Sequence, residues 1–172
     1  TWLNPLDFGN FLHELLCDFM QELKDNDEQP ESKHIPVLKA RAKEKAEKLK
    51  ETLPVTHEAA YRADIERLEQ TIEIFLNVEA RQKNTQPVGF EVSFGFGQMG
   101  ELDSPMPVLL RLAEGIKLNL RGRIDRVDKI EDGYAIWDYK SGSAYSYKEA
   151  SLNHAGSYLQ WALYAYVLDE IL

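Results

Sequence analysis

The stretch GRIDRVDKIEDGYAIWDYK, residues 122–140, alternates apolar and polar side chains on both sides of Asp132-Gly133. An Asp-Gly pair between two such runs is a strong signal for a tight β-hairpin. With these two residues as the loop, Asp125 is expected to pair with Lys140. Because side chains alternate between the faces of a strand, Asp125, Asp138 and Lys140 are predicted on one face. A pairing shift of two residues preserves this grouping, whereas a shift of one residue breaks it.

Two carboxylates and one ammonium group in a small patch suit the hydrolysis of a phosphodiester. Carboxylates are hard oxygen ligands for Mg²⁺, which also accepts substrate phosphate oxygens. The ion neutralises phosphate charge and activates water, and an adjacent lysine can position that water or accept its proton. The alternative is an exposed ladder of ion pairs without catalytic meaning. The neighbouring Ile124, Ile136 and Trp137 favour a central, apolar strand, where unpartnered carboxylates are costly.

The remaining chain divides into a helical first half and a second half rich in strands. Apolar residues recur at a helical period in residues 6–23, with Asp7 as the expected N-cap. Further helices are expected at 37–52, at 55–82 after the helix-breaking Pro54, and from about 155 to the end. Expected strands span residues 88–96, 108–112, 116–130 and 134–140. This order predicts an α/β or α+β fold with a mostly antiparallel sheet.

Length and composition indicate one globular domain of 172 residues, 44% hydrophobic and 28% charged. We expect a mainly helical part over 1–86 and a part with the sheet and final helix over 87–172. The chain starts without Met and stops inside an apolar run, so it is expected to be an excerpt of a longer polypeptide. No stretch is apolar enough for a transmembrane helix, and no secretory signal is evident, so a cytoplasmic location is expected. The net charge of −9 argues against coating of nucleic acid by bulk electrostatics.

Four short motifs resemble one known family. They are Gly9-Asn10-Phe11-Leu12-His13, then Gly122-Arg123-Ile124-Asp125-Arg126-Val127-Asp128, then Trp137-Asp138-Tyr139-Lys140-Ser141-Gly142, and finally Gln160-Trp161-Ala162-Leu163-Tyr164. In this order and spacing they resemble the PD-(D/E)XK nuclease superfamily, and within it the RecB/AddB-type exonuclease domains of bacterial recombination helicase–nucleases. Each motif alone is weakly specific, but together they span nearly the whole chain.

The resemblance implies roles for individual residues. Asp125 and Asp138 would ligate the metal, Lys140 would be the catalytic lysine, and the carbonyl of Tyr139 would be a further ligand. His13 would complete the metal shell from the first helix. From the last helix, Gln160 and Tyr164 would line the active site near Lys140 or the DNA backbone.

The residues themselves support these roles to different degrees. Gln160 and Tyr164 are four positions apart and share a helical face, which an ordinary amphipathic helix would also explain. His13 lies on an apolar face, and without the family it would be interpreted as a core histidine. A soft-metal pair of His13 with Cys17 would supply only two ligands. Glu91 could approach the site from a neighbouring strand, although an exposed strand carboxylate is the simpler interpretation.

The basic residues form three groups. Arg121 and Arg123 share the strand parity of Asp125 and could contact DNA phosphates. Arg126 and Asp128 point the other way and are expected to pair structurally. The basic run over 39–50 is interleaved with glutamates, so a solvated face with pairs such as Glu44–Lys48 is favoured over a DNA-binding patch.

Taken together, these features predict an α/β protein with a restriction-endonuclease-like core, its sheet flanked by helices, and a helical N-terminal part. The predicted activity is Mg²⁺- or Mn²⁺-dependent hydrolysis of DNA, with exonuclease favoured over endonuclease action. DNA and a helicase domain or subunit are the expected partners, with no membrane. One cysteine cannot hold the iron–sulfur cluster that many relatives bind through four cysteines. Two alternatives remain, a non-catalytic nuclease-like docking or DNA-binding module and a CRISPR-adaptation exonuclease.

Overall fold

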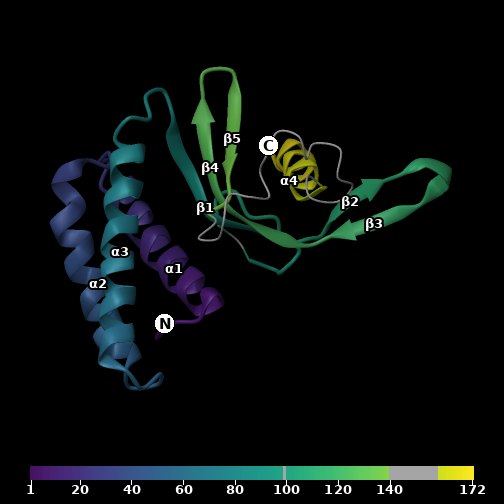
Figure 1. Ribbon diagram of the computed structural model, residues 1–172. Helices are drawn as coiled ribbons and strands as arrows, with labels where there is room; N and C mark the ends of the chain where they lie inside the picture. The colour runs from purple at the N-terminus through teal and green to yellow at the C-terminus, as the bar shows by residue number, and fades with distance from the viewer. Residues whose placement is uncertain (99, 140–158) are drawn as a thin grey trace, which may run out of the picture. The chain divides into compact units, whose positions relative to one another are not determined.

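A computed structural model of the chain describes residues 1–98, 100–139 and 159–172. Two compact units share these residues, a helical unit over Thr1–Asn84 and a sheet unit over Thr85–Tyr139 that also contains the last helix. The fold is mixed α/β with antiparallel sheets and a helical N-terminal part, as the sequence predicts (Figure 1). In the described part of the chain, no helix is both long enough and apolar enough to cross a membrane.

The helical unit contains α1 (Pro5–Asp25), α2 (Ile35–Leu49) and α3 (Glu58–Glu79), with a short 3-10 turn at Ser32–His34. The buried residues of α2 and α3 recur at intervals of four, and each helix therefore offers one apolar stripe to the other helices. These stripes are Leu38, Ala42 and Ala46 on α2 and Leu68, Ile72 and Leu76 on α3. The small alanines of α2 allow it to approach α3 closely along this seam.

The first helix begins three residues earlier than the predicted cap. The side chain of Asn4 accepts hydrogen bonds of 2.9 Å from the backbone N–H groups of Leu6 and Asp7, and Pro5 follows as the first helical residue. Proline is favoured there because its missing N–H would have no helical partner. The prediction of Asp7 as the N-cap is therefore wrong, since Asp7 lies inside the first turn, where a carboxylate is also favourable.

In the sheet unit, β1 (Gln86–Phe94), β4 (Gly122–Ile130) and β5 (Gly133–Trp137) form an antiparallel sheet in the order β1-β4-β5. Two shorter strands, β2 (Val108–Arg111) and β3 (Lys117–Leu120), form a separate antiparallel ribbon around a 3-10 turn at Ala113–Gly115. The ribbon extends away from the three-stranded sheet (Figure 1). The single strand predicted over 116–130 is thus two strands, which belong to different sheets on either side of Arg121.

The last helix, α4 (Leu159–Ile171), packs within the sheet unit. Its buried residues Val167 and Leu168 join a core formed with Val92, Phe94, Val108, Ile124 and Val127. The hydroxyl of Tyr166 donates a hydrogen bond of 2.9 Å to the carbonyl of Leu109 on β2, so α4 contacts the ribbon as well as the sheet. The predicted start of this helix, near residue 155, lies outside the described residues.

Candidate active site

The hairpin between β4 and β5 has a different register from the one predicted from its Asp-Gly pair. Ile130 pairs with Gly133 and Arg126 with Trp137, so the turn residues are Glu131 and Asp132. Gly133 has a φ of 152°, a conformation that residues with a Cβ rarely adopt, and it serves as the first residue of β5. The register therefore differs by two from the prediction and the grouping of side chains by face survives.

Continuation of this register beyond Trp137 places Asp138 across from Asp125. The backbone N–H of Tyr139 donates a hydrogen bond of 2.9 Å to Oδ2 of Asp125, which ties the segment after β5 to the carboxylate on β4. Asp125 and Asp138 are both half-buried. Lys140, the third member of the predicted cluster, lies outside the described residues.

Glu91 is the residue that the sequence interpretation undervalued. The flanking pairs Phe90–Arg126 and Val92–Ile124 place Glu91 directly across from Asp125 on β1. Carboxylate oxygens of Glu91 and Asp125 lie within 4.8 Å of each other. Glu91 is only partly exposed and has a φ of 51°, an unusual value for a residue with a side chain, and such strain is frequent at functional sites. Only the β1–β4 register could have revealed this pairing.

A buried ion pair supports this end of the sheet from its other face. The guanidinium of Arg126 donates to both carboxylate oxygens of Asp128, at 2.6 and 2.7 Å, and the two residues are 1% and 0% exposed. A third hydrogen bond of 2.9 Å runs from Arg126 to the hydroxyl of Tyr139. The predicted structural pairing of Arg126 with Asp128 is confirmed. Since the Tyr139 N–H holds Asp125, the pair also steadies the position of that carboxylate.

The two arginines predicted to contact DNA have different surroundings. Arg123 donates a hydrogen bond of 2.6 Å to Glu91 and so stands beside the acidic pair. Arg121 is exposed, and its aliphatic stem passes over Gly95, where an added Cβ would lie 2.6 Å from the arginine Cγ. No ion pair of Arg121 is found among the described residues, which leaves its charge available to an anionic ligand.

Gln160 and Tyr164 occupy one face of α4, as their spacing predicts. The Gln160 amide donates a hydrogen bond of 3.0 Å to the Tyr164 hydroxyl. Both side chains line a pocket of about 300 Å³ inside the sheet unit, together with Arg121. The family-derived positions on α4 and the predicted DNA-contacting arginine are thus brought together.

His13 lies on α1 in the helical unit. It is partly exposed, whereas Leu12, Leu16 and Met20 on the same helix are buried. His13 is therefore not enclosed by the apolar core of the helical unit, as the core-histidine interpretation requires. Its ligation of a metal stays a prediction.

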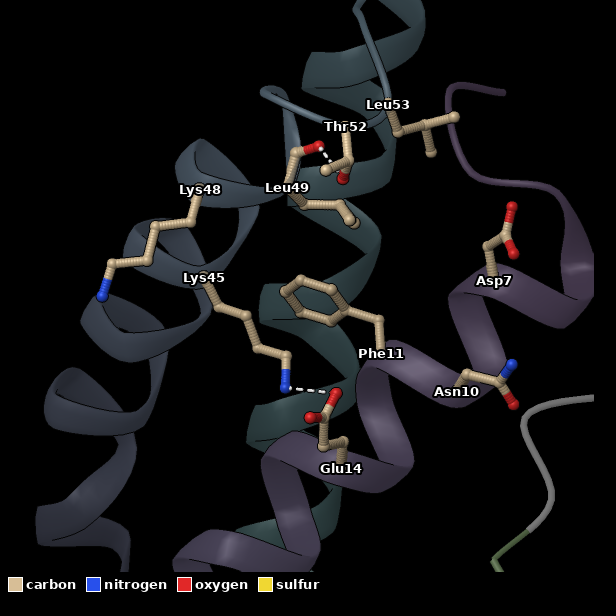
Figure 2. A pocket seen from close by; sticks show the side chains of 9 residues that line it. All are labelled: Asp7, Asn10, Phe11, Glu14, Lys45, Lys48, Leu49, Thr52 and Leu53. Atoms are coloured by element: carbon tan, nitrogen blue, oxygen red, sulfur yellow. Dashed lines mark hydrogen bonds and ion pairs between the residues drawn. The ribbon is translucent and has the colours of Figure 1, made fainter.

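A larger pocket of about 500 Å³ lies between α1 and α2 in the helical unit (Figure 2). Lys45 reaches into it and pairs with Glu14 at 2.7 Å, while its ammonium lies 5.5 Å from the centre of the Phe11 ring. Lys48 on its edge pairs with Glu44. Because both cations are already neutralised by glutamates, and because none of the predicted catalytic residues lines this pocket, the chemistry is not located there.

The basic run of α2 is a network of ion pairs rather than a free positive surface. All six of its cations have a glutamate partner, in the pairs Lys39–Glu73, Arg41–Glu22, Lys43–Glu69, Lys45–Glu14, Lys48–Glu44 and Lys50–Glu47. The predicted Glu44–Lys48 pair is confirmed. Four of the six partners, however, stand on α1 or α3, so the run ties the three helices together.

The donor set on β1 and β4 fits a divalent cation of the hard type. Glu91 and Asp125 offer carboxylate oxygens at a separation that one ion can bridge, and Mg²⁺ is commonly held by one or two carboxylates. Asp138 follows within reach along the register. No thiol or second imidazole is near in sequence, so the oxygen-rich set favours Mg²⁺ or Mn²⁺ over zinc.

Comparison with known proteins agrees with this donor set. A family model described as the PD-(D/E)XK nuclease superfamily matches residues 2–171, and the chain belongs to that family. Over 99% and 98% of its length, the chain is 31% and 34% identical to one subunit of the ATP-dependent helicase/deoxyribonuclease of Clostridium novyi and of Alkaliphilus metalliredigens, respectively. It spans about 15% of the length of each of these relatives. The subunit of the same name from Bacillus thuringiensis is 41% identical over 45% of the chain and 7% of its own length.

Proposed function

We propose that this chain is a divalent-metal-dependent deoxyribonuclease domain that acts as an exonuclease. The observation that carries the proposal is the Glu91–Asp125 carboxylate pair on neighbouring strands of the sheet, beside the segment that bears Asp138. Buried or half-buried acids of like charge are unfavourable together unless a cation or a proton compensates them. Family membership supplies the chemistry that such a cation serves.

In this proposal Asp125, Asp138 and Glu91 hold the ion, with the Tyr139 carbonyl and His13 as further ligands. A bound Mg²⁺ or Mn²⁺ neutralises phosphate charge and makes water a stronger nucleophile. Lys140 orients the attacking water and takes up its proton. The Tyr139 N–H fixes the rotamer of Asp125, and Arg126 holds Tyr139 in turn, so the ligands are oriented before the ion binds.

Substrate contacts are proposed for the cations and polar groups at the same end of the sheet unit. Arg121 and Arg123 contact DNA phosphates, and Gln160 and Tyr164 line the strand's path. Few cations are available on an acidic chain, so binding to DNA is expected to be weak, with a shallow dependence on salt concentration.

The named relatives suggest the cellular setting. We propose that the domain works beside a helicase, in the cytoplasm of a bacterium, on DNA ends during recombination and repair of double-strand breaks. Processive degradation would depend on the helicase, which would deliver the strand to a domain that grips DNA weakly by itself.

Digestion of end-labelled single- and double-stranded DNA tests the proposal. Cleavage is expected with Mg²⁺ or Mn²⁺ and none with EDTA. An exonuclease shortens linear strands progressively and leaves a circular single strand intact, whereas cleavage of the circle would show endonuclease action. Absence of cleavage of every substrate with either metal, in a chain that binds DNA, would instead favour a non-catalytic docking module.

A further inference from the structure

The pocket on α4 has features that the proposed hydrolysis does not require. It lies where the end of β1, the junction of β3 with β4 and the first turns of α4 meet, and its volume is about 300 Å³. We name it the α4 pocket, and its walls include Phe94, Leu120, Leu163 and Tyr164, with Gln160 and Arg121 at its polar side. Its size is at the lower limit for ligand pockets, which suits a single planar ring rather than a larger molecule.

The walls of the α4 pocket are apolar and aromatic, and they are held in place. The rings of Phe94 and Tyr164 are 6.4 Å apart at an interplanar angle of 83°. Phe94 is 3% exposed and stands in the core of the sheet unit, so its ring cannot leave the pocket wall without loss of packing. A preformed site with aromatic and aliphatic walls suits a flat ring that is removed from water.

The polar groups of the α4 pocket offer both donors and acceptors. Because the Gln160 amide uses one N–H on the Tyr164 hydroxyl, its carbonyl, its other N–H and the hydroxyl hydrogen can meet a ligand. Every nucleobase edge presents a mixture of donors and acceptors, so this pair can adapt to any of them. Such a pocket is expected to show little base preference, as is usual where stacking dominates.

The position of Arg121 adds an anion to the expected ligand. Its stem is fixed over Gly95, which has a φ of 82°, and its guanidinium has no ion pair among the described residues. Arg121 precedes Asp125 by four residues of nearly extended chain, a reach of about 13 Å at most. A stacked strand advances about 3.4 Å per nucleotide, so the pocket lies within a few nucleotides of the acidic pair.

We propose that the α4 pocket binds one unpaired nucleobase of a single-stranded DNA substrate, while Arg121 contacts the adjoining phosphate. The inference rests on the proposed nuclease function and names its substrate as a single strand. In a duplex the base edges are paired and the faces are stacked, so a base enters the pocket only from a single strand or a frayed end. The pocket thus selects the strand and sets the distance from the gripped base to the cleaved bond.

Abasic scanning of a short oligothymidine tests this assignment with the full chain. Each oligonucleotide carries one abasic site at a successive position, and fluorescence anisotropy measures its binding with Ca²⁺ in place of Mg²⁺ to prevent cleavage. One position is expected to weaken binding about tenfold, the scale of one lost base–aromatic stack. In Leu163→Trp, where the new ring fills the pocket, that position-specific loss should disappear.

Two further variants keep the test decisive. Ala165→Trp places the same ring on an exposed site of α4 outside the pocket and should retain the loss. If circular dichroism shows that Leu163→Trp does not fold, Leu159→Trp at the pocket mouth replaces it, since Leu159 is 59% exposed and carries little packing.

A uniform abasic penalty along the strand, or a position-specific penalty that persists when the pocket is filled, would overturn the inference. Its failure is distinct from failure of the nuclease proposal. Cleavage with Mg²⁺ but no coupling between pocket and base leaves the nuclease standing without its base site. Coupling without cleavage leaves the base site in a domain that binds DNA and does not cut it.

Discussion

The helical unit and the sheet unit each contain an arginine that donates two hydrogen bonds to one carboxylate. On the helical unit, Arg41 of α2 pairs with Glu22 of α1, and their side chains are 40% and 49% exposed. In the sheet unit, Arg126 pairs with Asp128, and their side chains are 1% and 0% exposed. The same chemistry therefore serves a solvated seam between helices in one unit and the interior of a sheet in the other.

The difference teaches where charge carries information in this chain. Ion pairs on a wet surface contribute little, because water and salt compete with them. A buried pair is tolerated only with its hydrogen bonds complete, and loss of one partner leaves an uncompensated charge. The Lys-rich run of α2 is therefore a structural seam, whereas the few charges on β1 and β4 are the ones expected to control activity.

The largest effects are expected from Asp138→Ala and Lys140→Ala. Each should reduce cleavage by about a hundredfold or more, because metal ligands and transition-state charges are affected directly. The two should differ in metal binding, which is weakened by loss of Asp138 and spared by loss of Lys140. Calorimetric titration of Mn²⁺ separates them from their cleavage rates.

Lys45→Ala is the matched control from the helical unit. It removes a lysine whose partner is Glu14, and cleavage should stay within about twofold of the unaltered chain, in line with the small effect of surface pairs. A hundredfold loss in this variant would contradict the contrast between the two units.

The next effect is on stability. Arg126→Met should lower the free energy of unfolding by about 3–5 kcal/mol, because Asp128 is left buried without its cation. Arg41→Met should cost about 0–1 kcal/mol, because Glu22 remains solvated. Urea denaturation of both variants measures the contrast, and similar losses in the two would show that burial does not separate these pairs.

The sequence was sufficient for the parity of the hairpin but not for its register. Alternation along residues 122–140 grouped Asp125 with Asp138, and the observed shift by two preserved that grouping. The exact turn depended on the backbone conformation of Gly133, which no side-chain pattern encodes.

Contacts between distant strands were equally hidden. Glu91 is paired with Asp125 through the β1–β4 register, across 34 residues of sequence that include the ribbon. The break at Arg121 follows from the packing of its stem on Gly95, a contact that hydrophobic periodicity does not predict. Local patterns therefore gave the elements, the family motifs gave the candidate residues, and non-local pairing decided which residues meet.

A smaller change in stability is expected at Gly122, the first residue of β4. A Cβ there would lie 2.6 Å from the Phe94 ring across the strands, and Phe94 is buried and cannot yield easily. Gly122→Ala should destabilise the chain by about 1–3 kcal/mol, as overpacking usually does. The double variant with Phe94→Leu should recover part of this loss in thermal denaturation. Strict additivity would argue against a steric origin.

The smallest effect concerns pH and the surface pair of α1 with α2. The hydrogen bond from Arg41 lowers the pKa of Glu22 below its usual value of 4.5. A lowered folded-state pKa contributes stability above the unfolded-state pKa, and the contribution is lost as pH falls through the folded-state value. Glu22→Gln should therefore cost less than about 1 kcal/mol at neutral pH and nothing in strong acid. Glu51→Gln, at another exposed glutamate, is the control in melting curves across this range.

The most direct test of the central claim is a calorimetric titration of Mn²⁺ into the unaltered chain and into Asp125→Asn. Asparagine keeps the shape of the side chain and can still accept from the Tyr139 N–H, but it removes the charge that faces Glu91. The unaltered chain should bind the ion, and Asp125→Asn should bind it at least about tenfold more weakly, the scale usual for changes around metal ligands. Equal affinity in the two proteins would contradict a metal centre built on β1 and β4.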